Sequence, residues 1–238
     1  MRSLTVAGSS RPELDSVHFS VAPGEIFGVA GVDGNGQDAL SECLTGLKRP
    51  ASGQILIDGS APAPNPAAFH RAGVTSVPAD RQRQGLALPL SLTENLTLGV
   101  HNDSRFRKGP LLNWPKLRER TRTAITRFDI RAEGPEAAAN SLSGGNQQKV
   151  VLARALADSP RVVVAVNPTR GLDVGAIAFV HDALRKARDA GAAIVLISTE
   201  LDEIQALSDR VGVLYEGRLT VAQDSSRATL GRLMGGAT

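Results

Sequence analysis

The chain has 238 residues, of which 42% are hydrophobic and 21% are charged, and its formal net charge is +3. This length and apolar content suffice for one large domain or for a core with an inserted subdomain. No run of about 18 apolar residues is present and the N-terminal apolar stretch is too short for a secretion signal, which argues against a membrane-spanning or secreted chain and for a soluble one. Cys43 is the only cysteine, so an internal disulfide is excluded and a reducing cytosol fits.

The positive charge is concentrated in one segment of the chain. Between His101 and Arg131, basic residues exceed acidic residues by six. Such a segment can mark a surface for nucleic acid or for anionic lipid. No aromatic stacking platform accompanies the charge, so the sequence favours a solvated helical face. Trp114 lies in the same segment beside Pro115 and is interpreted as a packing residue.

The first third of the chain reads as strands and turns. Alternating residues predict a strand over 14–21, Pro23-Gly24 predicts a turn, and an apolar run predicts a buried strand over 25–30. A glycine-rich loop follows, and apolar residues then recur at helical spacing from Ala39 to Leu47. Further short strands are expected over 53–59 and 72–78.

The rest of the chain returns to an α/β pattern after an interruption. From about residue 80 to 158 the pattern is irregular and then helical, which suggests an inserted subdomain. Buried parallel strands are expected over 161–166 and 192–198, and a hairpin is expected at Glu216-Gly217. The predicted fold is a single α/β domain with a parallel-sheet core, an antiparallel β edge and an inserted α-helical subdomain. The core is assigned to 1–79 and 159–238, and the helical subdomain to 80–158.

The glycine-rich loop, GVDGNGQD over 31–38, has the G-x-x-x-x-G spacing of a phosphate-binding loop. Its context of strand, loop and helix is the one that such a loop requires. A working loop continues with a lysine and a serine or threonine, which neutralise the phosphates and hold Mg²⁺. Gln37 and Asp38 stand at those positions, so one positive charge is missing and a negative charge is added. The loop alone leaves open a phosphate site, with Asp38 as an alternative Mg²⁺ ligand, or a plain strand-to-helix turn.

A second motif, LSGGNQQK over 142–149, precedes a predicted helix. Two glycines and a serine at a helix N-terminus offer N–H groups and a hydroxyl to an anion. This motif resembles the signature of the ATP-binding cassette (ABC) transporter ATPases, and nearly the whole chain follows that family's order. The resemblance is closest to the second cassette of the tandem-cassette ATPases that drive bacterial simple-sugar and nucleoside importers. It implies the P-loop NTPase fold of an ABC cassette.

The resemblance also assigns residues to ATP. In this family two cassettes meet head to tail, and each ATP lies between the phosphate loop of one cassette and the signature of the other. The resemblance places Gly31, Gly34, Asn35, Gly36, Gln37 and Asp38 in this chain's own nucleotide loop. It places Ser143, Gly144, Gly145, Gln147 and Asp173 against ATP held by a partner cassette.

The sequence departs from the family pattern where hydrolysis takes place. The strand before Pro168 normally ends in Asp-Glu, and Val166 and Asn167 occupy those positions. Thr199 replaces the switch histidine, Ala79 replaces the expected glutamine, and no aromatic residue precedes Phe19 to stack on adenine. Phosphoryl transfer needs a charge clamp, a metal ion and a group that orients water, and the usual version of each is missing. Therefore no catalytic residue and no metal site is assigned.

These observations favour a non-catalytic cassette whose signature completes the ATP site of a competent cassette, expected on the same natural polypeptide. Mg-ATP would bind mainly at that composite site, and the isolated domain would be an inactive or very weak ATPase. The resemblance implies transmembrane permease subunits as partners, an extracytoplasmic substrate-binding protein as an indirect partner, and no nucleic acid. It places the chain in the cytoplasm on the inner face of the cell membrane, with 81–85 and 91–96 as a coupling surface.

Two alternatives stay open. The basic segment motivates a soluble ABC-type ATPase that acts on nucleic acid or ribosomes. The acidic side chain of Asp38 motivates an independent ATPase or kinase that uses this carboxylate for Mg²⁺, for which no water-orienting group is identified.

Overall fold

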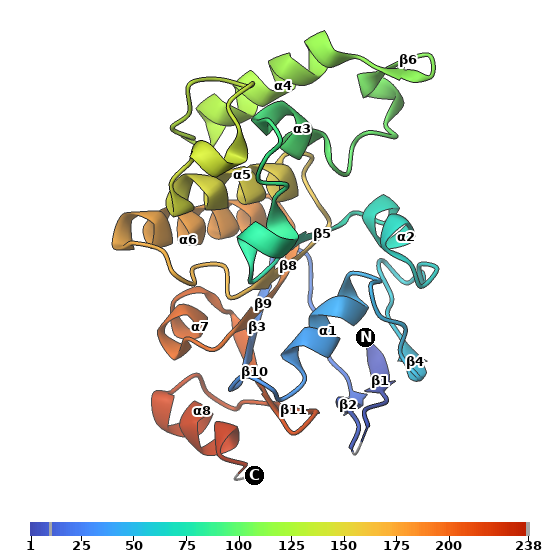
Figure 1. Ribbon diagram of the computed structural model, residues 1–238. Coiled ribbons are helices and arrows are strands. Elements are labelled where there is room, and N and C mark those ends of the chain that lie inside the picture. Colours follow the sequence, from blue (N-terminus) through green and yellow to red (C-terminus); the bar gives the residue numbers. More distant parts are fainter. Residues whose placement is uncertain (10, 237–238) are drawn as a thin grey trace. The chain divides into compact units, whose positions relative to one another are not determined.

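The computed structural model describes residues 1–9 and 11–236, which divide into two compact units (Figure 1). The core unit consists of the described residues of Met1–Ser76, Ser159–Asn167 and Leu184–Thr238. The signature unit consists of Val77–Asp158 and Pro168–Ala183. None of the helices in the described part of the chain is long and apolar enough to cross a bilayer.

A six-stranded sheet with the strand order β11-β10-β3-β9-β8-β5 is the main element of the fold. Strand β3 pairs in parallel with β10 and with β9, and β9 pairs in parallel with β8. Strand β11 is antiparallel to β10. The predicted parallel core with an antiparallel edge is therefore confirmed. The strands are β3 (Ile26–Ala30), β5 (Val74–Val77), β8 (Val162–Val166), β9 (Ala193–Ser198), β10 (Arg210–Tyr215) and β11 (Arg218–Val221).

The central strands form because they are apolar on both faces. Every residue of β3 and of β9 is buried, as is typical of parallel strands that helices cover on two sides. Figure 1 shows α1 on one side of the sheet and α7 and α8 on the other. The helices of the core unit are α1 (Gln37–Leu44), α2 (Pro66–Arg71), α7 (Leu201–Leu207) and α8 (Arg227–Met234), and α6 (Val174–Asp189) spans the boundary of the two units.

A second, antiparallel sheet lies in the core unit, with the order β2-β1-β4. Its strands are β1 (Arg2–Val6), β2 (Leu14–Val17) and β4 (Ser52–Gln54). The strand expected over 53–59 is shorter than predicted. Asp58 and Gly59 have φ of 48° and 79°, so the chain turns there and cannot continue as an extended strand.

The signature unit is mainly helical. Its longer elements are α3 (Leu92–Thr97), α4 (Trp114–Arg127) and α5 (Gly144–Leu156). Shorter elements connect them. These are a π-helical turn (Arg81–Gly85), two 3₁₀ turns (Ser104–Phe106 and Ala139–Ser141), and a hairpin of β6 (Arg107–Lys108) and β7 (Leu111–Leu112).

Cys43 leads to a first testable prediction. Its side chain is 1% exposed in α1, and burial raises the pKa of the thiol to about 11. An unfolded cysteine ionises near pH 8.5, so the unfolded state gains stability above that pH while the folded thiol stays neutral. The neutral Cys43 thiol therefore adds its full share to the free energy of unfolding below about pH 8.5. This share falls as the pH rises and is lost by the time the pH passes about 11.

The measurement is urea unfolding of the natural chain and of a Cys43→Ala variant from pH 7 to 11. We expect the difference between their free energies of unfolding to shrink by about 1.4 kcal/mol per pH unit above about pH 8.5. A difference that stays constant over this range would contradict the buried, neutral thiol.

Candidate functional site

The glycine loop connects β3 to α1 in the core unit, as predicted. Gly34 and Gly36 both lie in the left-handed region, with φ of 87° and 110°. A Cβ on Gly36 would lie 2.4 Å from the carbonyl oxygen of Glu13, so no larger residue fits this close approach. The backbone therefore has the turn that a phosphate loop needs at the start of a helix.

The side chain of Gln37 lies inside this loop and hydrogen-bonds to the loop's own backbone. Its Nε2 donates to the carbonyl oxygen of Val32 over 2.7 Å, and its Oε1 accepts from the N–H of Asn35 over 3.0 Å. The side chain is only 8% exposed, and Nε2 lies 2.7 Å from the position that a Cβ on Gly31 would take. A backbone amide that a phosphate would use is thus already bonded.

Asn35 connects the loop to the β10–β11 hairpin through hydrogen bonds. Its Oδ1 accepts from the N–H of Glu216 over 2.8 Å, and its carbonyl oxygen accepts from the N–H of Gly217 over 3.0 Å. Its Nδ2 donates to the carbonyl oxygen of Val32 over 3.0 Å. Sequence reasoning placed Asn35 in the loop but missed this anchor, because no local pattern connects residues 181 positions apart.

Two of the predicted departures contact each other at the ends of β8 and β9. The Oδ1 of Asn167 accepts from the N–H of Thr199 over 2.9 Å and lies 3.4 Å from its Oγ1. Asn167 has a φ of 40°, which asparagine tolerates better than most residues. Both side chains are neutral, and the side-chain oxygen of Asn167 already accepts the hydrogen bond from Thr199. The preceding residue, Val166, has a side chain that can neither bind a metal ion nor accept a hydrogen bond.

The core unit's residues do not fit Mg²⁺ and a triphosphate in the arrangement described. Gln37 fills the loop, Val166 offers no ligand, and Asp38 is an exposed carboxylate in the first turn of α1. Among the described residues, no three His, Cys, Asp or Glu side chains are grouped to hold a metal ion.

The signature motif forms the N-terminus of α5 in the signature unit. Ser143 is the N-cap, and its Oγ accepts from Nδ2 of Asn146 over 3.0 Å. Oδ1 of Asn146 in turn accepts from the N–H of Arg131 over 2.8 Å. Further along α5, Nζ of Lys149 donates to Asp129 over 2.7 Å and lowers the pKa of that carboxyl group. The helix start is thus held by side chains outside the glycines themselves.

Gln147 lies inside the unit. It is 4% exposed, its Nε2 donates to the carbonyl oxygen of Ala139 over 3.2 Å, and its Oε1 accepts from Nε2 of Gln82 over 3.2 Å. Both ends of the amide are therefore occupied by partners in the same unit.

Arg81 and Asp173 also lie beside the signature glycines. The guanidinium Nη1 of Arg81 donates to the carbonyl oxygen of Arg170 over 3.1 Å, and Nη2 lies 2.7 Å from where a Cβ on Gly144 would be. Asp173 caps α6 by accepting from the N–H of Ala176 over 2.9 Å, and it lies 3.9 Å from the Cβ position of Gly145. A cation at the positive end of a helix is unfavourable by itself, so the guanidinium donors of Arg81 suit an anionic oxygen there. Asp173 is a carboxylate that accepts hydrogen bonds. Sequence reasoning assigned Arg81 only to a coupling surface.

Comparison with known proteins gives the context of this geometry. The family model of the ABC transporter matches residues 14–170. The chain is 41% identical over 224 residues to the guanosine import ATP-binding protein NupO of Bacillus subtilis (strain 168), covering 92% of the chain and 44% of that protein. It is 40% identical over 225 residues to the ribose import ATP-binding protein RbsA of Chromobacterium violaceum, covering 93% of the chain and 44% of that protein.

The fold has close counterparts among solved structures. A nucleotide-free ATP-binding cassette from an ABC transporter superposes with a TM-score of 0.78 at 21% identity, over 97% of this chain and 93% of that one. The predicted cassette fold is therefore confirmed. The chain spans less than half the length of the curated relatives that it matches. The family model covers well over half of the chain, and the chain therefore belongs to the ABC transporter family.

Proposed function

We propose that this chain is the nucleotide-binding domain of an importer for simple sugars or nucleosides. We further propose that its signature motif contacts ATP that is bound by a catalytically competent partner cassette. The names of the relatives, which are import ATP-binding proteins for guanosine and ribose, support the choice of solutes. The partner cassette is expected on the same natural polypeptide. Permease subunits and, indirectly, an extracytoplasmic binding protein complete the assembly on the inner face of the membrane.

The observation that carries the non-catalytic part of this proposal is the position of Gln37. Its amide bonds to the loop's own Val32 carbonyl and Asn35 N–H, so a phosphate must first displace it. Gln37 brings no charge to offset the phosphates, whereas a lysine at about 4 Å would contribute on the order of 4 kcal/mol of raw Coulomb attraction at an effective dielectric of about 20. Binding of Mg-ATP to this loop is therefore weak.

A second requirement for ATP hydrolysis at this loop is also missing. The attacking water must be oriented by a group that accepts its hydrogen bond. At the end of β8, Asn167 uses its side-chain oxygen to accept from Thr199, and Val166 offers nothing to a metal ion. On this proposal the core unit does not turn over ATP itself.

The signature unit supplies the other half of the composite site. Ser143, Gly144 and Gly145 present a hydroxyl and backbone N–H groups to the γ-phosphate of the partner's ATP, and Asp173 borders them. Gln147 acts through the segment that it holds, because both ends of its buried amide are bonded. Bound Mg-ATP supplies the phosphoryl group that is transferred to water.

The test is a titration of the purified chain with ATP, with and without Mg²⁺, followed by phosphate release at saturation. Weak or metal-independent binding without turnover is the expected result. Tight, Mg²⁺-dependent binding with turnover would favour an independent ATPase that uses Asp38, and it would overturn the proposal.

A Gln37→Lys variant gives a sharper prediction. Lysine restores the positive charge and removes the amide that closes the loop, so the affinity for ATP is expected to rise by about tenfold or more. Phosphate release stays at background, because Val166 and Asn167 are unchanged. Isothermal titration and a phosphate-release assay measure the two effects separately. Turnover in this single variant above that of the natural chain would refute the role given to β8.

A further inference from the structure

The β6–β7 hairpin and the start of α4 carry an exposed patch that the proposed function does not use. Figure 1 shows this hairpin at the N-terminal end of α4 in the signature unit. In the hairpin register, Lys108 lies opposite Leu111. We define the hairpin patch as Arg107, Lys108, Leu111, Trp114 and Lys116.

The apolar members of the hairpin patch, Leu111 and Trp114, do not belong to the buried cluster that packs against the hairpin. Val100, Phe106 and Leu117 form a buried cluster beneath it, and Leu112 packs against that cluster. Leu111 is 71% exposed and Trp114 is 39% exposed. The expectation that Trp114 serves mainly in packing therefore accounts for only part of its side chain. A leucine and a tryptophan stay in contact with solvent, although the unit already has a core.

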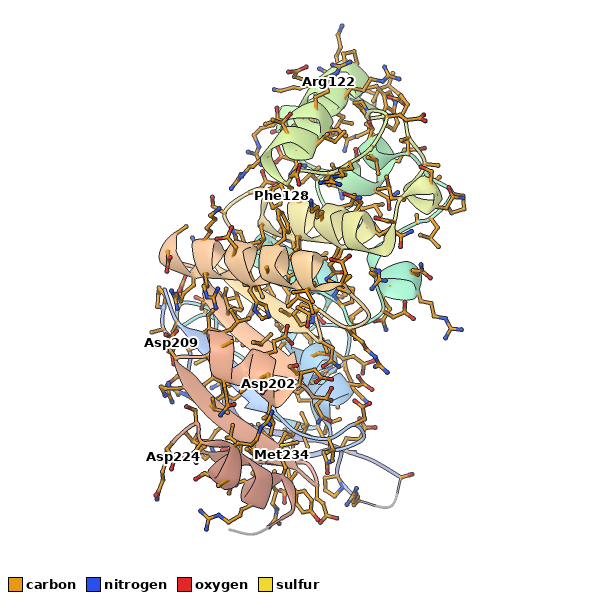
Figure 2. All side chains as sticks on the ribbon, turned by 90° about the vertical axis from the view of Figure 1, so that its left-hand side faces the viewer. Arg122, Phe128, Asp202, Asp209, Asp224 and Met234 are labelled. Atoms are coloured by element: carbon orange, nitrogen blue, oxygen red, sulfur yellow. The ribbon has the colours of Figure 1, made fainter. Side chains whose placement is uncertain are left out.

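The cations of the hairpin patch lack acidic partners. Arg105, Arg118, Arg120 and Arg122 in the same basic segment all pair with carboxylates. Figure 2 labels one of them, Arg122, on α4, together with Phe128 beyond the C-terminal end of that helix. By contrast, no acidic side chain among the described residues lies within ion-pair distance of the three cations of the hairpin patch, Arg107, Lys108 and Lys116.

Two of the three cations are held in place by other contacts. Nη2 of Arg107 donates to the carbonyl oxygen of Pro110 over 2.9 Å, which fixes the hairpin turn. The Nζ of Lys116 lies 5.9 Å from the ring centroid of Phe106. The nearby carboxylate of Glu119 is engaged by Arg122 over 3.1 Å. The positive charge of the hairpin patch therefore has no counterion in the described chain.

Exposed tryptophan and leucine beside uncompensated cations suit one environment in particular. At the surface of an anionic bilayer, an amphipathic tryptophan and a leucine enter the headgroup region while lysine and arginine meet the lipid phosphates. A nucleic acid would match the charge but would leave Leu111 without a partner, because stacking on bases requires aromatic side chains. We propose that the hairpin patch docks on the anionic lipid headgroups of the membrane.

The test is co-sedimentation of the purified chain with vesicles of phosphatidylcholine alone and of phosphatidylcholine with phosphatidylglycerol. The chain should bind the anionic vesicles, and added salt should weaken the binding. Lys108→Glu should reduce the partition coefficient by roughly tenfold or more, since each basic residue near an anionic surface contributes about fivefold. Leu111→Asp should reduce it by a similar factor.

Two matched variants of the core unit serve as controls. Leu47 is 70% exposed, which makes Leu47→Asp the counterpart of Leu111→Asp, and Arg49→Glu is the counterpart of Lys108→Glu. Both control variants should bind vesicles like the natural chain. Equal losses in the control and hairpin variants, or equal binding to neutral and anionic vesicles, would overturn the proposal. So would binding of the hairpin patch to single-stranded RNA in place of vesicles.

Trp114 provides a direct readout because it is the only tryptophan in the chain. Its fluorescence should shift to the blue when anionic vesicles are added, and brominated lipid should quench it. Binding without any change in Trp114 fluorescence would show that another surface meets the membrane and would refute the assignment to this patch.

Discussion

The Ser143→Arg variant of the intact assembly is expected to hydrolyse ATP at least about 100-fold more slowly than the unmodified assembly. Ser143 is exposed at the N-cap of α5, where its hydroxyl and the following amides offer donors to an anion. An arginine side chain would occupy the space in front of these amides and remove the hydroxyl. Loss of one preorganised donor to a developing negative charge typically costs 10²- to 10³-fold in rate.

Ser141→Arg is the matched control for this experiment. Ser141 is also exposed, lies two residues earlier, and donates to the carbonyl oxygen of Ala138 over 2.8 Å. The same change of residue at this site should leave turnover within about twofold of the unmodified assembly. The removed cap at Ser143 is worth about 1 kcal/mol, so the domain should still fold, which an unfolding curve verifies. Normal turnover in Ser143→Arg would refute the complementing role of the signature.

The Asn95→Ala variant is expected to lose about 3 kcal/mol of unfolding free energy. Asn95 is fully buried in α3, and its Oδ1 accepts from the N–H of Ala87 over 2.9 Å. Its Nδ2 lies within hydrogen-bond distance of the carbonyl oxygens of Ala87, Leu90 and Ser91, at 3.0, 3.2 and 3.0 Å. Truncation leaves the part-buried N–H of Ala87 without a partner, which costs about 1–3 kcal/mol. It also removes one bond from each of the three carbonyl oxygens, which keep the backbone N–H donors of Leu90, Ala139 and Asn95 and therefore add smaller losses.

Denaturant unfolding of the variant and of Asn102→Ala measures this effect. Asn102 is an exposed asparagine of the same unit, so its replacement should change the free energy of unfolding by no more than about 0.5 kcal/mol. Similar unfolding midpoints for the two variants would mean that water replaces the Asn95 hydrogen bonds at little cost.

The parts of the fold that could be predicted from the sequence are those with a local cause. Strands β3, β8 and β9 read as uninterrupted apolar runs because parallel strands are covered on both faces. The β10–β11 hairpin could be read from Glu216-Gly217, where both residues have positive φ. The glycine loop and the signature could be located from their spacing, since each must sit at the start of a helix.

The contacts that decide the proposed chemistry had no such local signal. Asn167 and Thr199 bond to each other across 32 positions of the chain, and only the pairing of β8 with β9 brings them together. The inward position of the Gln37 side chain depends on its rotamer, which the residue types alone do not specify. Sequence comparison with the family pattern therefore identified the unusual residues, whereas only the structure shows what each of them contacts.

The amide of Gln37 also bears on how this domain responds to the state of the cell. A protein that needs a ligand to order its binding loop becomes more stable as the ligand concentration rises and less stable as it falls. Here the loop receives its hydrogen bonds from within the chain, so its order does not depend on nucleotide. Under the proposed function, a domain built in this way keeps its stability when cellular ATP is depleted and can present its signature to a partner cassette whose own site is empty.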